Sequence, residues 1–284
     1  MEINKVAVLG AGTMGTGITW TFATAGKQVV VFDIVQPAVD KCLTTIKKGL
    51  AKAEEKGQIP AGSADAAMAN IKGTTVLEDI ADADFVLESV LEKMPIKKDV
   101  YGKLAAILKD DVIVATNTSA LSITEIANIY KRPDKVVGMH FFNPAQVMKL
   151  IEVIAAAQTS QETVDEVIAL SKAIGKKPIQ VKEGPGFVVN RILIPGINEA
   201  AFIFYEGLAS AADIDTAMKL GAGWPMGPLQ LADLVGVDIA LEVANTLYEE
   251  TGDPKYRPAP PLKQYERAGW LGMKTGKGFF DYKK

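Results

Sequence analysis

The stretch VAVLGAGTMGTGIT, residues 6–19, decides the fold of the first part of the chain. A short apolar run, typical of a buried strand, leads directly into Gly10, Gly12 and Gly15, and a helical pattern follows. In this G-x-G-x-x-G spacing the first glycine permits a tight turn, the second lets the backbone approach a pyrophosphate, and the third lets the helix pack closely on the strand. Unpaired N–H groups at the start of the helix also attract phosphates. The stretch predicts a dinucleotide-binding turn, with a glycine turn that binds no ligand as the alternative.

An acidic residue ends the next β-branched run. Asp33 closes QVVVFD, residues 28–33, and comes 18 residues after Gly15. A carboxylate at this place can accept hydrogen bonds from ribose hydroxyls and repels a 2′-phosphate. The sequence therefore predicts NAD, rather than NADP, as the cofactor.

Short apolar runs and longer helical patterns alternate through the first two thirds of the chain. After residues 5–10 and 28–33, strand-like runs recur at 83–89, 112–117, 135–142, 149–154 and 177–181. Strands separated by helix-length segments predict βαβ units and a mainly parallel sheet that is buried on both faces. The segment 37–57 instead predicts a long amphipathic helix, which we take as part of an extended helical hairpin near 37–70.

The pattern changes after residue 185. From Gly186 onward the sequence predicts helices and turns, with no convincing strand before the last residues. The expected helices cover residues 186–207, 213–221 and 231–252, the last as one helix or two, and Asp213 is the expected N-cap of the second. We therefore predict an α/β fold with a Rossmann-type dinucleotide-binding domain over 1–185, followed by an all-α domain over 186–284.

Composition is that of a globular protein. The 284 residues are 48% hydrophobic and 23% charged, with a net charge of −3, so nothing predicts nucleic-acid binding. Cys42 is the only cysteine, which excludes an intrachain disulfide and a cysteine-rich metal site and fits a reducing compartment. We recognise neither a secretory signal nor an uninterrupted apolar run of membrane-spanning length. The expectation is a cytoplasmic protein that uses no membrane and no metal.

His140 is the only histidine of the chain. It lies in GMHFFNPAQVMKLIEVI, residues 138–154, at the end of a predicted strand, where open α/β sheets bind their ligands. Beside a nicotinamide, an imidazole could take the hydroxyl proton of an alcohol during hydride transfer, because its ordinary pKa lies near neutral pH. Glu152, on the next strand-like run, could pair with this ring and fix its tautomer. A hydrogen-bonded structural histidine and an exposed strand glutamate are the alternatives.

Short polar side chains follow another predicted strand in ATNTSALSI, residues 115–123. Asn117, Thr118 and Ser119 lie at the same edge of the predicted sheet and could reach a ligand there. Ordinary helix capping before the next helical pattern is the alternative.

Taken together, these motifs resemble the L-3-hydroxyacyl-CoA dehydrogenase family. The resemblance covers essentially the whole chain, through residues 6–15, 117–127, 138–154, 184–195, 213–236 and 269–282. It implies NAD(H)-dependent interconversion of a short-chain (S)-3-hydroxyacyl-CoA and the 3-oxoacyl-CoA. The bacterial branch that it most resembles implies 3-hydroxybutyryl-CoA and acetoacetyl-CoA as the pair.

The resemblance also implies residue roles. His140 would be the general base in oxidation and the general acid in reduction, with Glu152 orienting it, and Ser119 and Asn190 would hydrogen-bond the reacting oxygen in a cleft between the domains. The implied cofactor contacts are Gly10, Gly12, Thr13, Met14, Gly15, Asp33, Glu88, Lys93, Asn117, Asn143 and Lys274. A homodimer through the C-terminal domain is implied as well.

Two lysines are the implied contacts for coenzyme A. Lys52 and Lys56 lie four residues apart on the predicted helix, so they share a face that suits phosphates. A solvated helix face is the alternative. The chain departs from residues usual in the family at Gly196, Gln146 and Trp224, without loss of an implied catalytic residue. A dehydrogenase of a free hydroxy acid and a non-catalytic NAD-binding protein are the rival functions.

Overall fold

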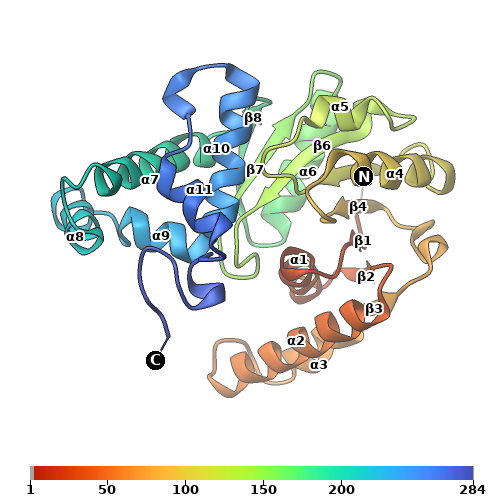
Figure 1. The fold of residues 1–284 in the computed structure, drawn as a ribbon. Helices are drawn as coiled ribbons and strands as arrows, with labels where there is room; N and C mark the ends of the chain where they lie inside the picture. The colour runs from red at the N-terminus through yellow and green to blue at the C-terminus, as the bar shows by residue number, and fades with distance from the viewer. Residues whose placement is uncertain (1–2, 284) are drawn as a thin grey trace. The chain divides into compact units, whose positions relative to one another are not determined.

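A computed structural model describes residues 3–283 of the chain. It divides into two compact units between Glu183 and Gly184, close to the boundary expected after residue 185 (Figure 1). The N-terminal unit is an α/β domain and the C-terminal unit is helical, which confirms the predicted fold class.

The N-terminal unit is built on one eight-stranded sheet, in the order β3-β2-β1-β4-β5-β6-β7-β8. Its strands are β1 (Lys5–Leu9), β2 (Gln28–Phe32), β3 (Ile71–Thr74), β4 (Phe85–Glu88), β5 (Ile113–Thr116), β6 (Val136–Phe141), β7 (Leu150–Ala155) and β8 (Lys177–Lys182). Neighbouring strands are parallel except β6 and β7, which are antiparallel. The first six strands have the order of the Rossmann sheet, 3-2-1-4-5-6. The order in which the chain adds strands reverses at β1, although all six strands are parallel.

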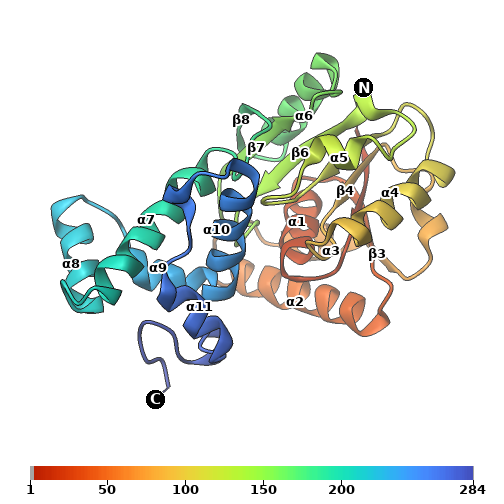
Figure 2. The ribbon, with the colours of Figure 1, turned by 45° about the horizontal axis from the view of Figure 1, so that its top comes forward.

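Helices lie on both faces of this sheet (Figure 2). They are α1 (Thr13–Thr24), α2 (Gln36–Glu55), α3 (Ser63–Ala69), α4 (Met94–Ile107), α5 (Ile123–Ala127) and α6 (Gln161–Ala173). The core on one face joins alternate strand residues, such as Val6, Val8, Val137 and Met139, to α1, α2, α3 and α6. Because side chains alternate along a strand, the residues between them face α4 and α5. His140 is one of these.

The expected helical hairpin is formed by α2 and α3. One face of α2 is buried through Val39, Cys42, Ile46 and Leu50. Its partner α3 is fixed by Glu54, whose carboxylate accepts hydrogen bonds from the N–H groups at 62 and 64, 2.8 and 3.0 Å away. These bonds lower the pKa of the Glu54 carboxyl. The lysines of α2 stay on its exposed side.

The C-terminal unit packs its helices around a second core. They are α7 (Val189–Tyr205), α8 (Ala211–Gly221), α9 (Pro228–Val235), α10 (Val237–Thr251) and α11 (Pro260–Arg267). Among the described residues of this unit, extended pairing is limited to isolated bridges of Lys277 with Gly272 and Asp281. None of the helices within residues 3–283 is long and apolar enough to cross a membrane.

The expected N-cap of the helix over 213–221 was wrong. The helix begins earlier, and Ser210 is its N-cap, accepting a hydrogen bond from the Asp213 N–H at 3.2 Å. The Ser210 hydroxyl in turn donates to the Asp213 carboxylate at 2.6 Å. The pair is a variant of the capping box, in which an acidic residue three positions after the cap completes the turn.

Candidate active site

Several predicted site residues of the N-terminal unit lie together at the carboxyl ends of its parallel strands. Strands β1, β2, β4, β5 and β6 are parallel, so their carboxyl ends meet at one edge of the sheet. Gly10 follows β1, Asp33 follows β2, Asn117 follows β5, and His140 is the penultimate residue of β6. The sequence predicted this grouping because parallel strands put their carboxyl ends side by side.

The glycine loop has the geometry that each of its glycines requires. Gly10 has φ of 96°, and a Cβ there would lie 2.4 Å from the Ser89 carbonyl oxygen. A Cβ on Gly15 would lie 1.8 Å from the Gly10 carbonyl oxygen, so only glycine lets α1 start against β1. A Cβ on Gly12 would instead meet no described atom within 4 Å. The loop is therefore tightly packed at Gly10 and Gly15 and free of described neighbours at Gly12, where a pyrophosphate would approach.

The start of α1 is free for an anion. Gly12 is the N-cap, and no side chain of the described residues caps the helix. The N–H groups of the first turn, which includes Thr13 and Met14, are available to phosphates for this reason. Asp33 braces the same loop, since its carboxylate accepts hydrogen bonds from the N–H groups of Ala11 and Val35 at 2.8 and 3.0 Å. The residues present fit a dinucleotide.

His140 and Glu152 face each other across β6 and β7. They form a register pair of the antiparallel strands, and His140 Nδ1 lies 2.8 Å from Glu152 Oε2. The glutamate side chain is fully buried and the histidine side chain is 6% exposed. The ring of Phe142 lies 4.6 Å from the imidazole, centroid to centroid. A carboxylate at this distance can hold the imidazole in one tautomer, and the acid–base role of His140 stays a prediction.

Asn117 joins β5 to β6. Its side-chain oxygen accepts a hydrogen bond from the Phe141 N–H at 2.8 Å, and its own N–H donates to the Glu88 carbonyl at 2.8 Å. The residue is 9% exposed. These bonds fix the exit of β5 beside the strand that carries His140.

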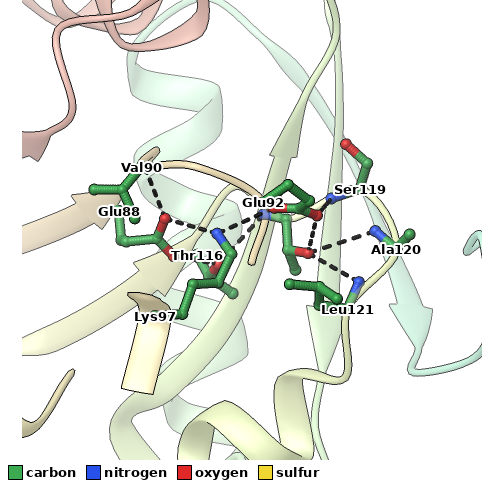
Figure 3. Close-up of polar contacts among 9 residues, drawn as sticks. Glu88, Val90, Glu92, Lys97, Thr116, Ser119, Ala120 and Leu121 are labelled. Carbon is green, nitrogen blue, oxygen red and sulfur yellow. Dashed lines mark hydrogen bonds and ion pairs between the residues drawn. The ribbon is translucent and has the colours of Figure 1, made fainter. Parts of the chain in front are cut away.

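A buried charge cluster lies at the ends of β4 and β5 (Figure 3). The Glu88 carboxylate is fully buried and binds Lys97 Nζ at 2.7 Å, the Thr116 hydroxyl at 2.7 Å and the Val90 N–H at 2.8 Å. The structure thus gives this carboxylate internal partners. A cofactor contact by Glu88 stays a prediction.

Glu92 binds the predicted site residue Ser119, a contact that the sequence did not predict. Its carboxylate lies 3.1 Å from Lys97 Nζ, accepts the Ser119 N–H at 2.8 Å and accepts the Thr118 hydroxyl (Figure 3). Glu92 therefore holds the beginning of the segment that carries Ser119. A glutamate in a short loop before a helix gave no signal of this contact, because it depends on how β4 and β5 pair.

Two family comparisons match nearly the whole chain. The NAD-binding domain of 3-hydroxyacyl-CoA dehydrogenases matches residues 5–184, and the C-terminal domain of the same enzymes matches residues 186–282. The chain belongs to the 3-hydroxyacyl-CoA dehydrogenase family. The N-terminal unit is accordingly the NAD-binding domain, and the chain is an NAD-dependent oxidoreductase of this family.

Individual relatives in the family are similar over nine tenths or more of their length. A 3-hydroxybutyryl-CoA dehydrogenase of Clostridioides difficile is 52% identical over 280 residues, 99% of this chain and 100% of that one. The mitochondrial hydroxyacyl-coenzyme A dehydrogenase of Homo sapiens is 38% identical, with 99% and 92% covered. The crystal structure of (S)-3-hydroxybutyryl-CoA dehydrogenase from Ralstonia eutropha has a TM-score of 0.96 and 46% identity, with both chains fully covered.

Several predicted contacts of the NAD-binding domain lie on its surface. Lys52 is in the last turn of α2, Lys56 is its C-cap, and both are exposed. Lys93, the N-cap of α4, and Asn143, in the turn after β6, are exposed as well. All four are accessible to ligands, and their roles stay predictions.

Two predicted contacts belong to the C-terminal unit. Asn190 is half-buried in the first turn of α7. Lys274 Nζ lies 2.6 Å from both carboxylate oxygens of Asp238, so it has an ion-pair partner within its own unit. A cofactor contact by Lys274 stays a prediction.

The departures from the family pattern have local packing partners. A Cβ on Gly196 would lie 3.3 Å from the ring of Trp224, so the small residue in α7 admits the large one beside it. Likewise, a Cβ on Gly17 of α1 would lie 2.7 Å from the Gln146 side-chain oxygen. Gly196 and Trp224 therefore lie side by side, and Gln146 lies against α1, the helix that follows the glycine loop.

Proposed function

We propose that the chain interconverts a short-chain (S)-3-hydroxyacyl-CoA and its 3-oxoacyl-CoA, with 3-hydroxybutyryl-CoA and acetoacetyl-CoA as the preferred pair. The observation that carries the proposal is the His140–Glu152 pair at the sheet edge that also holds the dinucleotide loop. Support for the substrate comes from relatives named 3-hydroxybutyryl-CoA dehydrogenase, one of them 52% identical over its full length.

The histidine handles the proton in this proposal. Bound NAD supplies the hydride acceptor in oxidation and, when reduced, the donor. Because His140 Nδ1 faces Glu152, Nε2 is the ring nitrogen that takes the hydroxyl proton of the substrate and returns it in the reverse direction. Glu152 holds the tautomer and stabilises the imidazolium that forms.

Other residues position the substrate. Ser119 and Asn190 donate hydrogen bonds to the reacting oxygen, where negative charge grows during reduction. Lys52 and Lys56 attract the phosphates of coenzyme A, and their exposure on α2 is consistent with this role. We further propose a homodimer through the C-terminal domain and a cytoplasmic location, which the single, buried Cys42 supports.

The remaining polar residues serve the cofactor in the same proposal. Asp33 binds the ribose and disfavours a 2′-phosphate, while Asn117, Asn143, Lys93 and Lys274 complete the contacts. The support is the placement of Asp33 directly beside the glycine loop, through its bond to the Ala11 N–H.

The deciding experiment is the initial rate of NADH oxidation with acetoacetyl-CoA, with free acetoacetate and NADPH as parallel substrates. We expect fast turnover only with the thioester and NADH. Turnover of free acetoacetate at a similar rate would replace the substrate by a free hydroxy acid. NADH binding without turnover of either compound would contradict the assignment of His140.

A further inference from the structure

The segment that carries Ser119 is held at both ends by carboxylates. At its beginning Glu92 binds the Thr118 hydroxyl and the Ser119 N–H. The Thr118 hydroxyl oxygen then accepts the N–H groups at 120 and 121, 3.4 and 3.0 Å away. In Figure 3 the side chain of Ser119 projects away from Glu92. The hydroxyl of Ser119 thus depends on the backbone of this segment for its placement.

Glu183 holds the other end of the segment. Its Oε1 accepts the Ser122 hydroxyl at 3.0 Å and the Thr124 N–H at 3.0 Å, and its Oε2 accepts the Thr124 hydroxyl. The Thr124 hydroxyl oxygen also accepts the Ala157 N–H at 3.0 Å. One half-buried carboxylate therefore satisfies three donors at the start of α5, and hydrogen bonds to a charged acceptor are stronger than neutral ones.

The backbone of Glu183 is attached to the strand that carries Glu152. Glu183 follows β8, which pairs with β7 along its length, and its N–H donates to the Ala155 carbonyl at 3.2 Å. Glu152 lies three residues earlier on β7 and faces His140. The hydrogen bonds therefore connect the Ser119 segment through Glu183 to β7, the strand that carries Glu152.

We propose that Glu183 is a positioning residue, which fixes the Ser119 hydroxyl relative to the His140–Glu152 pair. The inference rests on the proposed function, in which Ser119 and His140 act on the same oxygen. Without Glu183 the segment is held by carboxylate only at Glu92, and its far end can shift. A shift of this kind slows the reaction because rates depend steeply on alignment, about 100-fold for a misplacement of 1 Å.

The test compares Glu183→Gln with Glu125→Gln. Glutamine keeps the size of Glu183 but turns one acceptor oxygen into an NH₂ group that cannot accept from the same donors. Glu125 is in α5, the helix whose start Glu183 binds, and it pairs with Lys98 at 2.7 Å on the surface, so its variant is a control for loss of one negative charge. We expect Glu183→Gln to lower kcat with acetoacetyl-CoA about 10-fold and to leave the Kd of NADH unchanged, while Glu125→Gln stays within about twofold.

A double mutant separates positioning from a general loss of stability. If Glu183 acts through Ser119, then Glu183→Gln lowers kcat by less than about twofold when Ser119→Ala is already present. An equal fractional loss of kcat in both backgrounds overturns the proposal, and so does a wild-type kcat in Glu183→Gln.

Hydrogen exchange gives a readout that needs no turnover. In Glu183→Gln we expect faster exchange of the amides at 118–124, with unchanged rates in the central strands. Unchanged exchange in this segment overturns the inference. If the wild-type protein fails to reduce acetoacetyl-CoA, but Glu183→Gln changes the exchange rates at 118–124 as expected, the result counts against the proposed function alone.

Discussion

His140 Nδ1 and Glu152 Oε2 lie 2.8 Å apart because the two residues are directly opposite in the antiparallel pair of β6 and β7. Opposite residues of such a pair point to the same face, so the contact follows from strand register. The reversal of direction at β7 also places Glu152 at the carboxyl-end edge of the parallel strands. Glu152 lies in the first half of β7. If β7 were parallel to β6, its first half would lie at the opposite end of the sheet, away from His140.

The first prediction concerns this pair. His140→Asn should lower kcat by about 10²–10⁴, the usual contribution of general acid–base catalysis, and Glu152→Gln should lower it by a similar order because the tautomer is no longer fixed. Neither side chain belongs to the glycine loop, so the Kd of NADH from fluorescence titration should stay within about twofold. Wild-type turnover in both variants would contradict the proton-transfer roles.

The second prediction concerns the charge cluster behind the site. Lys97 is 1% exposed and neutralises the fully buried Glu88, so Lys97→Met leaves a buried carboxylate without its cation. Removing one partner of a buried pair lowers the free energy of unfolding by roughly 3–5 kcal/mol. Urea denaturation should show this loss.

Lys98→Met is the matched control for Lys97→Met. Lys98 pairs with Glu125 at the surface, with about half of each side chain exposed, and such pairs contribute about 0–1 kcal/mol. Equal urea midpoints for the two variants would mean that leaving Glu88 without Lys97 costs no more than breaking a surface ion pair.

The fold was largely predictable because the strands between β2 and β7 in the sheet are apolar and mostly buried. Each predicted strand is present within a residue or two of its expected bounds. The strand β3 was missed because Ile71-Lys72-Gly73-Thr74 lies at the sheet edge, is only partly buried and contains a glycine. Edge strands lack the apolar pattern of buried ones. The N-cap Ser210 was detectable, since a serine precedes Asp213 by three residues.

The site was predictable where a local pattern carries it, as in the glycine loop. His140 and Glu152 could be suggested from the sequence, but their contact depends on the register of β6 and β7. Glu92 and Glu183 had no signal, because each binds a segment that is distant along the chain. A single acidic residue in a loop or at a strand end looks like a solvated side chain until the sheet is assembled.

The third prediction tests the choice of cofactor. Asp33→Asn removes the charge that disfavours a 2′-phosphate and keeps an acceptor for the Ala11 N–H. We expect the ratio of kcat/KM for NADH to that for NADPH to fall about 10-fold. Asp40→Asn, in the exposed part of α2 where Asp40 accepts from Gln36, removes the same charge as a control. An unchanged ratio in Asp33→Asn would exclude Asp33 as the discriminating residue.

The fourth prediction uses Tyr130, whose buried hydroxyl has no hydrogen-bond partner among the described residues. Burial, aided by the charge of Asp110, raises the pKa of Tyr130 from about 10 to about 12. The unfolded chain therefore loses this proton first, and the stability linked to it is present below pH 10 and lost as the pH rises through 12. Tyr130→Phe removes this dependence.

Unfolding of wild type and Tyr130→Phe should therefore be compared at pH 8 and pH 11. At pH 8 the variant should be about as stable as wild type, because an unpaired hydroxyl is lost. At pH 11 it should be the more stable of the two. An equal difference at both pH values would show that the Tyr130 pKa is not raised by folding.

The last prediction concerns coenzyme A. Lys52→Ala and Lys56→Ala should each raise the KM for acetoacetyl-CoA several-fold and leave kcat nearly unchanged, because their charges act on phosphates far from the reacting carbon. Both effects should shrink at high salt, since exposed charges are screened. Lys47 is exposed on the same helix but five residues before Lys52, so it points to a different side. Lys47→Ala should therefore leave the KM unchanged. An equal rise of the KM in all three variants would mean that the lysines of α2 attract anions generally and form no specific phosphate site.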